Sequence, residues 1–156
     1  MSILKQGNEL DKTISSLKVE KKKIVFTNGV FDIIHRGHIE YLREAKKLGD
    51  ILLIGLNSDS SVKTIKGNKR PINNENDRAA VLDNLKPVDY VVIFNEENPY
   101  NLIRQILPDF LVKGGDWSPE NIIGSDIVMK NGGKVISLKY VDDYSTTAII
   151  SKISER

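Results

Sequence analysis

The amino-acid sequence predicts a single α/β domain with a five-stranded parallel sheet flanked by helices. Short runs of β-branched and other apolar residues alternate along the chain with stretches in which apolar residues recur at helical spacing. The 156 residues, of which 40% are hydrophobic, are enough for one core and include no long polar tract. We expect the domain to span residues 23–156, preceded by a helix and a basic segment in residues 1–22.

The helices are predicted from spacing and from their end signals. Leu10, Ile14 and Leu17 indicate an opening helix, and residues 39–48 a second one that ends at Gly49. The segments 73–85, 99–107 and 146–153 indicate three more, the last with Ser145 as its N-cap. Strands are expected at 23–28, 51–57, 90–94, 110–113 and 134–138.

Composition excludes several classes of protein. The chain has 23 Lys and Arg against 21 Asp and Glu, and this net charge of +2 is too small to indicate a nucleic-acid or membrane partner. Because it has no cysteine, disulfides, thiolate metal sites and cysteine nucleophiles are excluded. Apolar runs are short and the N-terminus lacks the pattern of a signal peptide, so we expect a cytoplasmic protein.

The most informative segment, residues 28–38, follows the first predicted strand. It contains both histidines of the chain, His35 and His38, at the predicted start of a helix. A helix start has unpaired N–H groups and the positive end of the helix dipole, so imidazoles there favour phosphate binding. Gly29 and Gly37 allow the backbone to approach a ligand, and Asp32 adds a carboxylate. Two surface histidines, or a zinc site completed by carboxylates, are the alternatives.

A basic segment, residues 63–71, follows the second predicted strand. Lys63, Lys66, Lys69 and Arg70 place four cations in eight residues, which predicts a mobile loop that covers a triphosphate. Taken alone, such a run of charges can equally face water.

Further candidates lie in later segments. Arg78, on a predicted helix, either reaches the ligand or pairs with Asp77. The glycines in residues 113–116 suit a backbone that lies against a base or sugar, although an ordinary turn also uses them. Three hydroxyls at 145–147 favour a second phosphate at the start of the last helix. The glycine motifs of dehydrogenases and P-loop enzymes do not occur, so both classes are minor alternatives.

These motifs carry a family resemblance over about residues 24–153. Residues 29–38 match Gly-x-Phe-Asp-x-x-His-x-Gly-His and residues 145–147 match a late Ser-Thr-Thr, so the sequence resembles the cytidylyltransferase-like nucleotidyltransferases. Tyr144 and Trp117 stand where cysteine and tyrosine are common in the branch that it is most similar to, and both could line the sugar pocket. That branch is the D-glycero-β-D-manno-heptose 1-phosphate adenylyltransferases. The segments that carry the similarity to it are 27–32, 57–59, 66–67, 70–71, 77–79, 111–116, 131–133 and 145–150.

The resemblance implies a Rossmann-like nucleotidyltransferase fold with its site at the carboxyl edge of the sheet. It implies that AMP passes from ATP to a sugar 1-phosphate, giving ADP-heptose and pyrophosphate for lipopolysaccharide or surface-glycan synthesis. Magnesium is expected with ATP. A separate sugar kinase and a phosphatase are expected in the pathway, and a homodimer is left open.

The chemistry of that reaction assigns roles to the charged candidates. A sugar phosphate is an anion at pH 7, so it can attack the α-phosphorus without a general base, and catalysis consists of positioning and charge stabilisation. We expect His35 and His38 to bind the triphosphate and the α-phosphorus. Lys66, with help from Lys63, is expected at the substrate phosphates, and Arg78 at the β- and γ-phosphates.

The other candidates are expected to bind or orient. Ser145 and Thr146 would hold the leaving pyrophosphate, and Asp32 would orient a histidine or coordinate magnesium. Gly114 and Asp116 would lie near the base or ribose. The rest of the expected nucleotide-binding set is Asn28, Gly29, Phe31, Gly37, Asp59, Lys63, Lys113 and Thr147.

Two other functions stay open at this point. A glycerol 3-phosphate or other polyol-phosphate cytidylyltransferase would share the histidine motif and the Ser-Thr-Thr, and its preference for CTP would distinguish it. A nucleotide-binding regulatory module would keep the pocket but would release no pyrophosphate.

Overall fold

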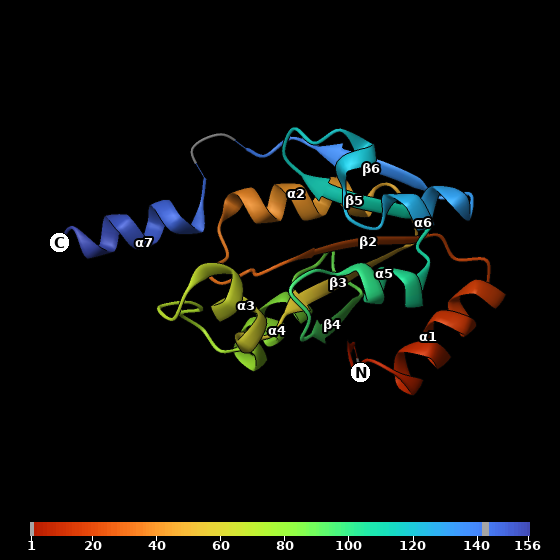
Figure 1. Ribbon diagram of the computed structural model, residues 1–156, viewed down its shortest axis with the longest axis horizontal. Coiled ribbons are helices and arrows are strands. Elements are labelled where there is room, and N and C mark those ends of the chain that lie inside the picture. Colours follow the sequence, from red (N-terminus) through yellow and green to blue (C-terminus); the bar gives the residue numbers. More distant parts are fainter. Residues whose placement is uncertain (1, 142–143) are drawn as a thin grey trace.

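The computed structural model describes residues 2–141 and 144–156 and contains a six-stranded sheet (Figure 1). All strands are parallel and lie in the order β1-β4-β3-β2-β5-β6. The predicted parallel α/β sheet is confirmed, but the sequence does not predict β1, because two residues give no periodic pattern. The strands are β1 (Ile3–Leu4), β2 (Ile24–Gly29), β3 (Ile51–Asn57), β4 (Tyr90–Phe94), β5 (Phe110–Gly114) and β6 (Lys134–Leu138).

Helices connect the strands and cover the sheet (Figure 1). Those that the sequence predicts are α1 (Asn8–Val19), α2 (Arg36–Lys46), α4 (Glu75–Asp83), α5 (Tyr100–Ile106) and α7 (Thr146–Ser154). Those that it does not predict are α3 (Asp59–Lys66) and α6 (Ser125–Lys130), with a 3₁₀ turn at Pro119–Asn121.

Helix α3 corrects the expectation of a loop over residues 63–71. It begins after Ser58, whose side chain accepts a hydrogen bond from the backbone N–H of Ser61. Val62 is fully buried and anchors the helix to the body. Residues 63–66 are therefore helical, and the lysine-rich pattern did not indicate this because a two-turn helix whose only buried apolar side chain is Val62 shows no apolar repeat.

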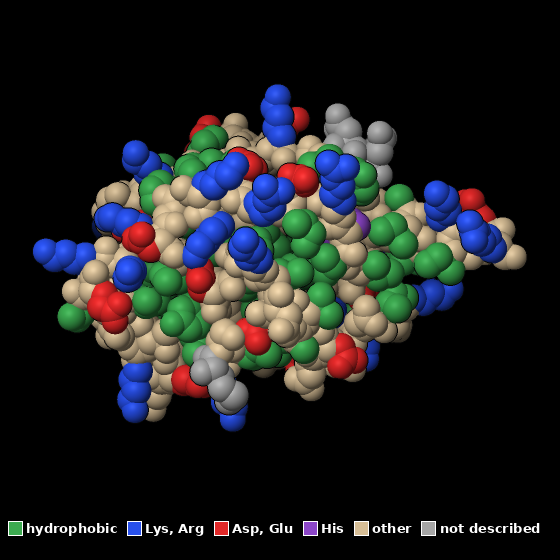
Figure 2. All heavy atoms as spheres, turned by 180° about the vertical axis from the view of Figure 1, so that it is seen from behind, with side chains coloured by type: hydrophobic (Ala, Val, Ile, Leu, Met, Phe, Trp, Pro, Cys, Tyr) green, Lys and Arg blue, Asp and Glu red, His purple; other side chains and the backbone are tan. Residues whose placement is uncertain are grey.

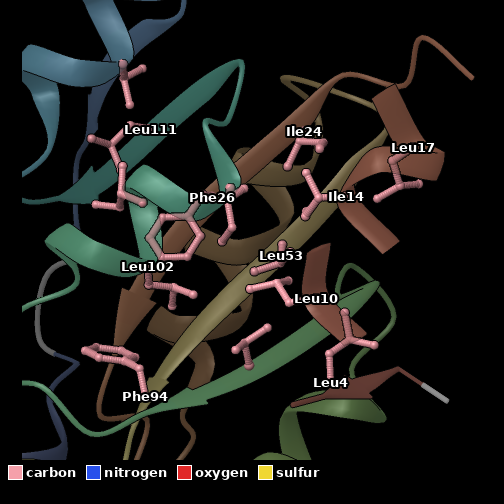
Figure 3. Packing of buried hydrophobic residues seen from close by; sticks show 14 of the residues in the cluster. Leu4, Leu10, Ile14, Leu17, Ile24, Phe26, Leu53, Phe94, Leu102 and Leu111 are labelled. Carbon is pink, nitrogen blue, oxygen red and sulfur yellow. The ribbon is translucent and has the colours of Figure 1, made fainter. Parts of the chain in front are cut away.

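The hydrophobic core lies on both faces of the sheet. On one face, Leu10 and Ile14 of α1 pack in a cluster with Phe26 of β2 (Figure 3). On the other face, Leu42 of α2 packs in a second cluster with Val25 of β2. Successive residues of a strand point to opposite faces, and both faces are covered, as is usual for parallel sheets. Because α1 shares this core, residues 2–22 pack as part of the same unit as the described residues that follow them.

The strand order determines where a ligand can bind. β3 and β4 lie on one side of β2, whereas β5 and β6 lie on the other, so the direction of winding reverses between β2 and β5. In open parallel sheets, ligands bind beyond the carboxyl ends of the strands at such a reversal. Helix α7 projects from this end of the molecule, and none of its residues is buried (Figure 1). Asp142 and Asp143, shortly before the hydroxyls at 145–147, lie outside the described residues.

The surface carries mixed charge. On the face drawn in Figure 2, Lys and Arg side chains are scattered among Asp and Glu side chains. Histidine surface is visible beside hydrophobic side chains, toward the end that carries α7. In the described part of the chain, no helix combines the length and the apolar character needed to cross a membrane.

Candidate active site

A pocket of about 410 Å³ lies at the carboxyl edge of the sheet. Its volume falls within the range of roughly 300–1,000 Å³ that is common for small-molecule sites. The walls come from the end of β2, the first turn of α2, the end of α3, the end of β5 and the start of α7. The expected site residues that line it are Asn28, Gly29, Phe31, Asp32, His35, Gly37, His38, Lys66, Lys113, Gly114, Ser145, Thr146 and Thr147.

His35 and His38 form a stacked pair at the start of α2. Their ring centroids are 3.9 Å apart, and the ring planes meet at 30°. His35 is the N-cap residue, and its backbone N–H donates to Nδ1 of His38 over 3.2 Å. Because Nδ1 accepts this hydrogen bond, the proton of neutral His38 lies on Nε2. The start of α2 therefore offers an imidazole N–H donor beside the unpaired backbone N–H groups of the helix.

The two imidazoles are neutral at pH 7 in the free protein. Burial, together with the neighbouring His35 ring, lowers the pKa of His38 from 6.5 to about 4. Burial also lowers the pKa of His35, whose Nδ1 is buried without a hydrogen-bond partner among the described residues. The pair thus meets a phosphate as hydrogen-bond donors rather than as cations. A bound phosphate would raise both pKa values, because an adjacent anion favours the protonated ring.

The protonation state of His38 can be measured by NMR. We expect its ring protons to titrate near pH 4 in the ligand-free protein. Folded His38 binds a proton less readily than unfolded His38, so the unfolding free energy should fall as the pH decreases from 6.5 toward 4. A His38→Asn variant, which cannot titrate, should lose this part of the pH dependence. A His38 midpoint above 6.5 would contradict the neutral pair.

Two glycines of the site make room for aromatic rings. A Cβ atom at Gly37 would lie 2.9 Å from ring atoms of His35 and from Cβ of Tyr144. A Cβ atom at Gly114 would lie 2.5 Å from Cε1 of Tyr140. The glycine at the end of β5 therefore accommodates the Tyr140 ring on the pocket wall, a role that the sequence pattern did not indicate.

Several residues that line the pocket were not among the site residues predicted from the sequence. Tyr41 follows His38 by three positions, and this spacing on one helix face is a signal that could have placed it. Tyr144, which was expected to line the sugar pocket, lies on the wall, whereas Trp117 packs outside it with Nζ of Lys113 5.3 Å from its ring centroid. The lining residues that were not expected are Val30, Tyr41, Tyr140 and Val141, whereas Arg70 was expected only as one of the four cations of the basic segment.

The start of α7 forms another wall of the pocket. The expected N-cap is confirmed, because Oγ of Ser145 accepts a hydrogen bond from the N–H of Ala148 over 2.9 Å. The hydroxyl of Thr146 donates to the carbonyl of Ile33 over 2.9 Å, which ties α7 to the loop after β2. The groups left for a phosphate are the hydroxyl protons of Ser145 and Thr147 and the N–H groups of the helix start.

Arg78 does not reach the pocket. Its side chain is fully buried, and Nε donates to the carbonyl of Asn73 over 2.9 Å. Nη1 donates to the carbonyls of Val30 and Asn57 over 2.7 and 2.8 Å. Nη2 pairs with the carboxylate of Asp59 over 2.8 Å. This geometry contradicts the assignment of Arg78 to the β- and γ-phosphates, and it makes Asp59 the partner of Arg78 rather than a nucleotide ligand.

Asp32 holds a loop instead of a histidine or a metal. Its carboxylate has no exposed surface and accepts hydrogen bonds from Nε of Arg70 and the backbone N–H groups of Ile72 and Asn73, over 3.0, 2.8 and 2.9 Å. Burial alone would raise the pKa of Asp32, but these hydrogen bonds and the Arg70 charge bring it below the ordinary value. Both oxygens are thus engaged, which contradicts the two roles that were expected of Asp32.

Lys63 and Asp116 also lie outside the pocket. Both are exposed, Lys63 on α3 and Asp116 after β5. Lys66, one helical turn beyond Lys63, does line the pocket, as does Lys113, whose pKa is lowered by burial. The cations that face the ligand space therefore differ in part from those that the sequence indicated.

Phosphate-binding groups of several kinds line this one pocket. The histidine pair and the start of α2 form one wall, the start of α7 another, and Lys66 and Lys113 add charge. Two helix starts and added cations around one pocket, where the strand order of a Rossmann-like sheet reverses, are the arrangement that a nucleotidyltransferase needs, and this is the class of the protein. The chain belongs to the cytidylyltransferase-like family, whose model matches residues 26–152.

Comparisons with individual proteins agree with that membership. The chain is 51% identical over 154 residues to the bifunctional protein HldE of Aliarcobacter butzleri, and 50% identical over 147 residues to that of Citrobacter koseri. The alignments cover 99% and 94% of this chain but 32% and 31% of those relatives, so the chain spans about a third of their length.

Two solved structures share the fold. A lipopolysaccharide core biosynthesis protein from Thermoplasma volcanium is 33% identical, and its TM-score is 0.60. The alignment covers 80% of this chain and 99% of that one. The pantoate-beta-alanine ligase of Francisella tularensis is 16% identical, and its TM-score is 0.61. The alignment covers 100% of this chain and 78% of that one. The second likeness concerns the fold alone.

Proposed function

We propose that this chain transfers the AMP group of ATP to D-glycero-D-manno-heptose 1-phosphate and releases pyrophosphate. The observation that carries the proposal is the meeting of two helix starts, the histidine pair and the lysines in one pocket. The HldE relatives and the Thermoplasma volcanium protein support an acceptor used in lipopolysaccharide or surface-glycan synthesis. We place the reaction in the cytoplasm, where ATP is available.

The site supplies the groups that this transfer needs. An oxygen of the acceptor phosphate forms a bond to the α-phosphorus, the bond from that phosphorus to the β-phosphate oxygen breaks, and pyrophosphate leaves. The acceptor is already anionic, so no proton has to be removed. Nε2–H of His38 and the N–H groups of α2 stabilise charge on the α-phosphoryl group. Lys66 binds the substrate phosphates, and the start of α7, with Ser145 and Thr147, holds the leaving pyrophosphate.

Magnesium enters this scheme with ATP. Among the described residues, no group of three or more His, Cys, Asp or Glu side chains is placed to hold a metal ion. The carboxylates of Asp32 and Asp59 are engaged by Arg70 and Arg78. The described side chains therefore do not provide a ligand set for the ion, and the phosphates and water supply ligands that Mg²⁺ prefers.

A pyrophosphate-release assay tests the proposed function. ATP and CTP are each combined with heptose 1-phosphate and with glycerol 3-phosphate, and reactions without acceptor measure hydrolysis. Of the four substrate pairs, we expect only ATP with heptose 1-phosphate to give pyrophosphate release that depends on the acceptor. Release with CTP and glycerol 3-phosphate would instead identify a polyol-phosphate cytidylyltransferase. Nucleotide binding without release in any combination would indicate a regulatory module.

A further inference from the structure

Arg70 differs from the lysines of the basic segment 63–71. Lys63, Lys66 and Lys69 are exposed to solvent. The side chain of Arg70 is only 15% exposed, and the residue lines the pocket. A charged group that is drawn out of water against a ligand pocket requires either a protein partner, a ligand or both.

The protein partner of Arg70 is Asp32, which engages one side of the guanidinium. Nε of Arg70 donates to Oδ2 of Asp32 over 3.0 Å. Asp32 is itself fixed, because it accepts two backbone N–H groups and its own carbonyl accepts from Nδ2 of Asn73 over 3.0 Å. Within residues 2–141 and 144–156, the two Nη groups of Arg70 have no hydrogen-bond acceptor, whereas Arg78 donates to protein from all three nitrogens.

We propose that Arg70 binds a substrate phosphate through its Nη groups, and that Asp32 is a positioning residue that acts through Arg70. The inference rests on the proposed function and adds to it a binding residue that the histidine and Ser-Thr-Thr motifs do not contain. A guanidinium presents paired N–H donors that match two oxygens of one phosphate. Because Asp32 already fixes the side chain, little rotamer entropy remains to be lost when the phosphate binds. The phosphate belongs either to ATP or to the sugar phosphate, and direct binding distinguishes them.

The test compares Arg70→Gln with Lys69→Gln, which removes the same charge from an exposed neighbour. Calorimetric titration with MgATP and with heptose 1-phosphate, separately, reports Kd without turnover. We expect Arg70→Gln to raise Kd about tenfold or more for one of the two ligands, since hydrogen bonds to charged groups are lost. Lys69→Gln should leave both constants within about twofold of the wild-type values.

The outcomes separate this inference from the proposed function. A larger Kd for MgATP places Arg70 at the triphosphate, and a larger Kd for heptose 1-phosphate places it at the acceptor. Unchanged constants in Arg70→Gln, or equal losses in both variants, would overturn the proposal. If the wild-type protein binds MgATP but releases no pyrophosphate, the proposed function fails while the Arg70 comparison can still be made.

The positioning role of Asp32 requires a double-mutant cycle. Asp32→Asn should weaken binding of the same ligand as Arg70→Gln does, and it should have no further effect on Kd in the Arg70→Gln background. A merely structural Asp32 would weaken binding equally in both backgrounds. Thermal unfolding of all variants identifies any general loss of stability, so the cycle is read from variants that remain folded at the titration temperature.

Discussion

Replacement of His38 by asparagine is expected to lower kcat by about a hundredfold or more while the protein stays folded. The asparagine amide oxygen can take the place of Nδ1, which accepts the N–H of His35 over 3.2 Å, so the start of α2 keeps its hydrogen bond. No donor replaces Nε2–H. Loss of one preorganised donor at a transition state costs about 2.7–4 kcal/mol, which corresponds to roughly 10²–10³ in rate. Steady-state pyrophosphate release at saturating MgATP and heptose 1-phosphate measures the effect.

A glutamine at the same position provides the matched control. Its amide lies one carbon farther out, closer to the position of Nε2, so His38→Gln should keep more activity than His38→Asn. Circular dichroism and the unfolding free energy establish that both variants are folded. Near-wild-type kcat in His38→Asn would refute the catalytic role, and equal loss in both variants would show that hydrogen bonding from Nε2 is not what matters.

The part of the site that sequence predicts well is local in the chain. Residues 28–38 form one strand end, one loop and one helix start, so their spacing alone brings His35 and His38 together. Ser145 is likewise a cap of its own helix. The two segments meet because parallel strands deliver their carboxyl ends to the same edge. Periodicity and capping are sufficient for such features.

The charged residues are harder to place, because sequence does not reveal which cation meets which anion. Arg70 and Arg78 lie eight residues apart, and each has a carboxylate partner, Asp32 or Asp59, that is distant in the chain. One guanidinium is buried completely, and the other lies at the pocket wall. An arginine that binds the backbone of neighbouring loops and one that faces a ligand can have the same kind of residues around them in the sequence. Tertiary packing alone decides between them.

Replacement of Arg78 by methionine is expected to reduce the unfolding free energy by about 3–5 kcal/mol, because the change removes a fully buried guanidinium that binds three backbone carbonyls and a partly exposed carboxylate. The side chain has no exposed surface, and its donors satisfy three backbone carbonyls and the carboxylate of Asp59. Methionine fills much of the space but leaves those acceptors without donors, which costs far more than the lost ion pair alone. Urea denaturation, with the midpoint and the slope fitted together, gives the difference.

Arg43→Met is the control, since Arg43 pairs with Glu40 over 3.8 Å and its side chain is 58% exposed. An exposed pair of this kind contributes about 0.5 kcal/mol or less. The comparison also tests the structural role of Arg78 against the phosphate role that its buried geometry contradicts. If it bound the β- and γ-phosphates, Arg78→Met would lower kcat and leave the unfolding free energy near that of Arg43→Met. If Arg78 instead ties the loops after β2 and β3 to α4, the main effect of Arg78→Met must be a lower unfolding free energy. Any loss of activity at low urea should then recover when the MgATP concentration is raised, because the ligand stabilises the folded state.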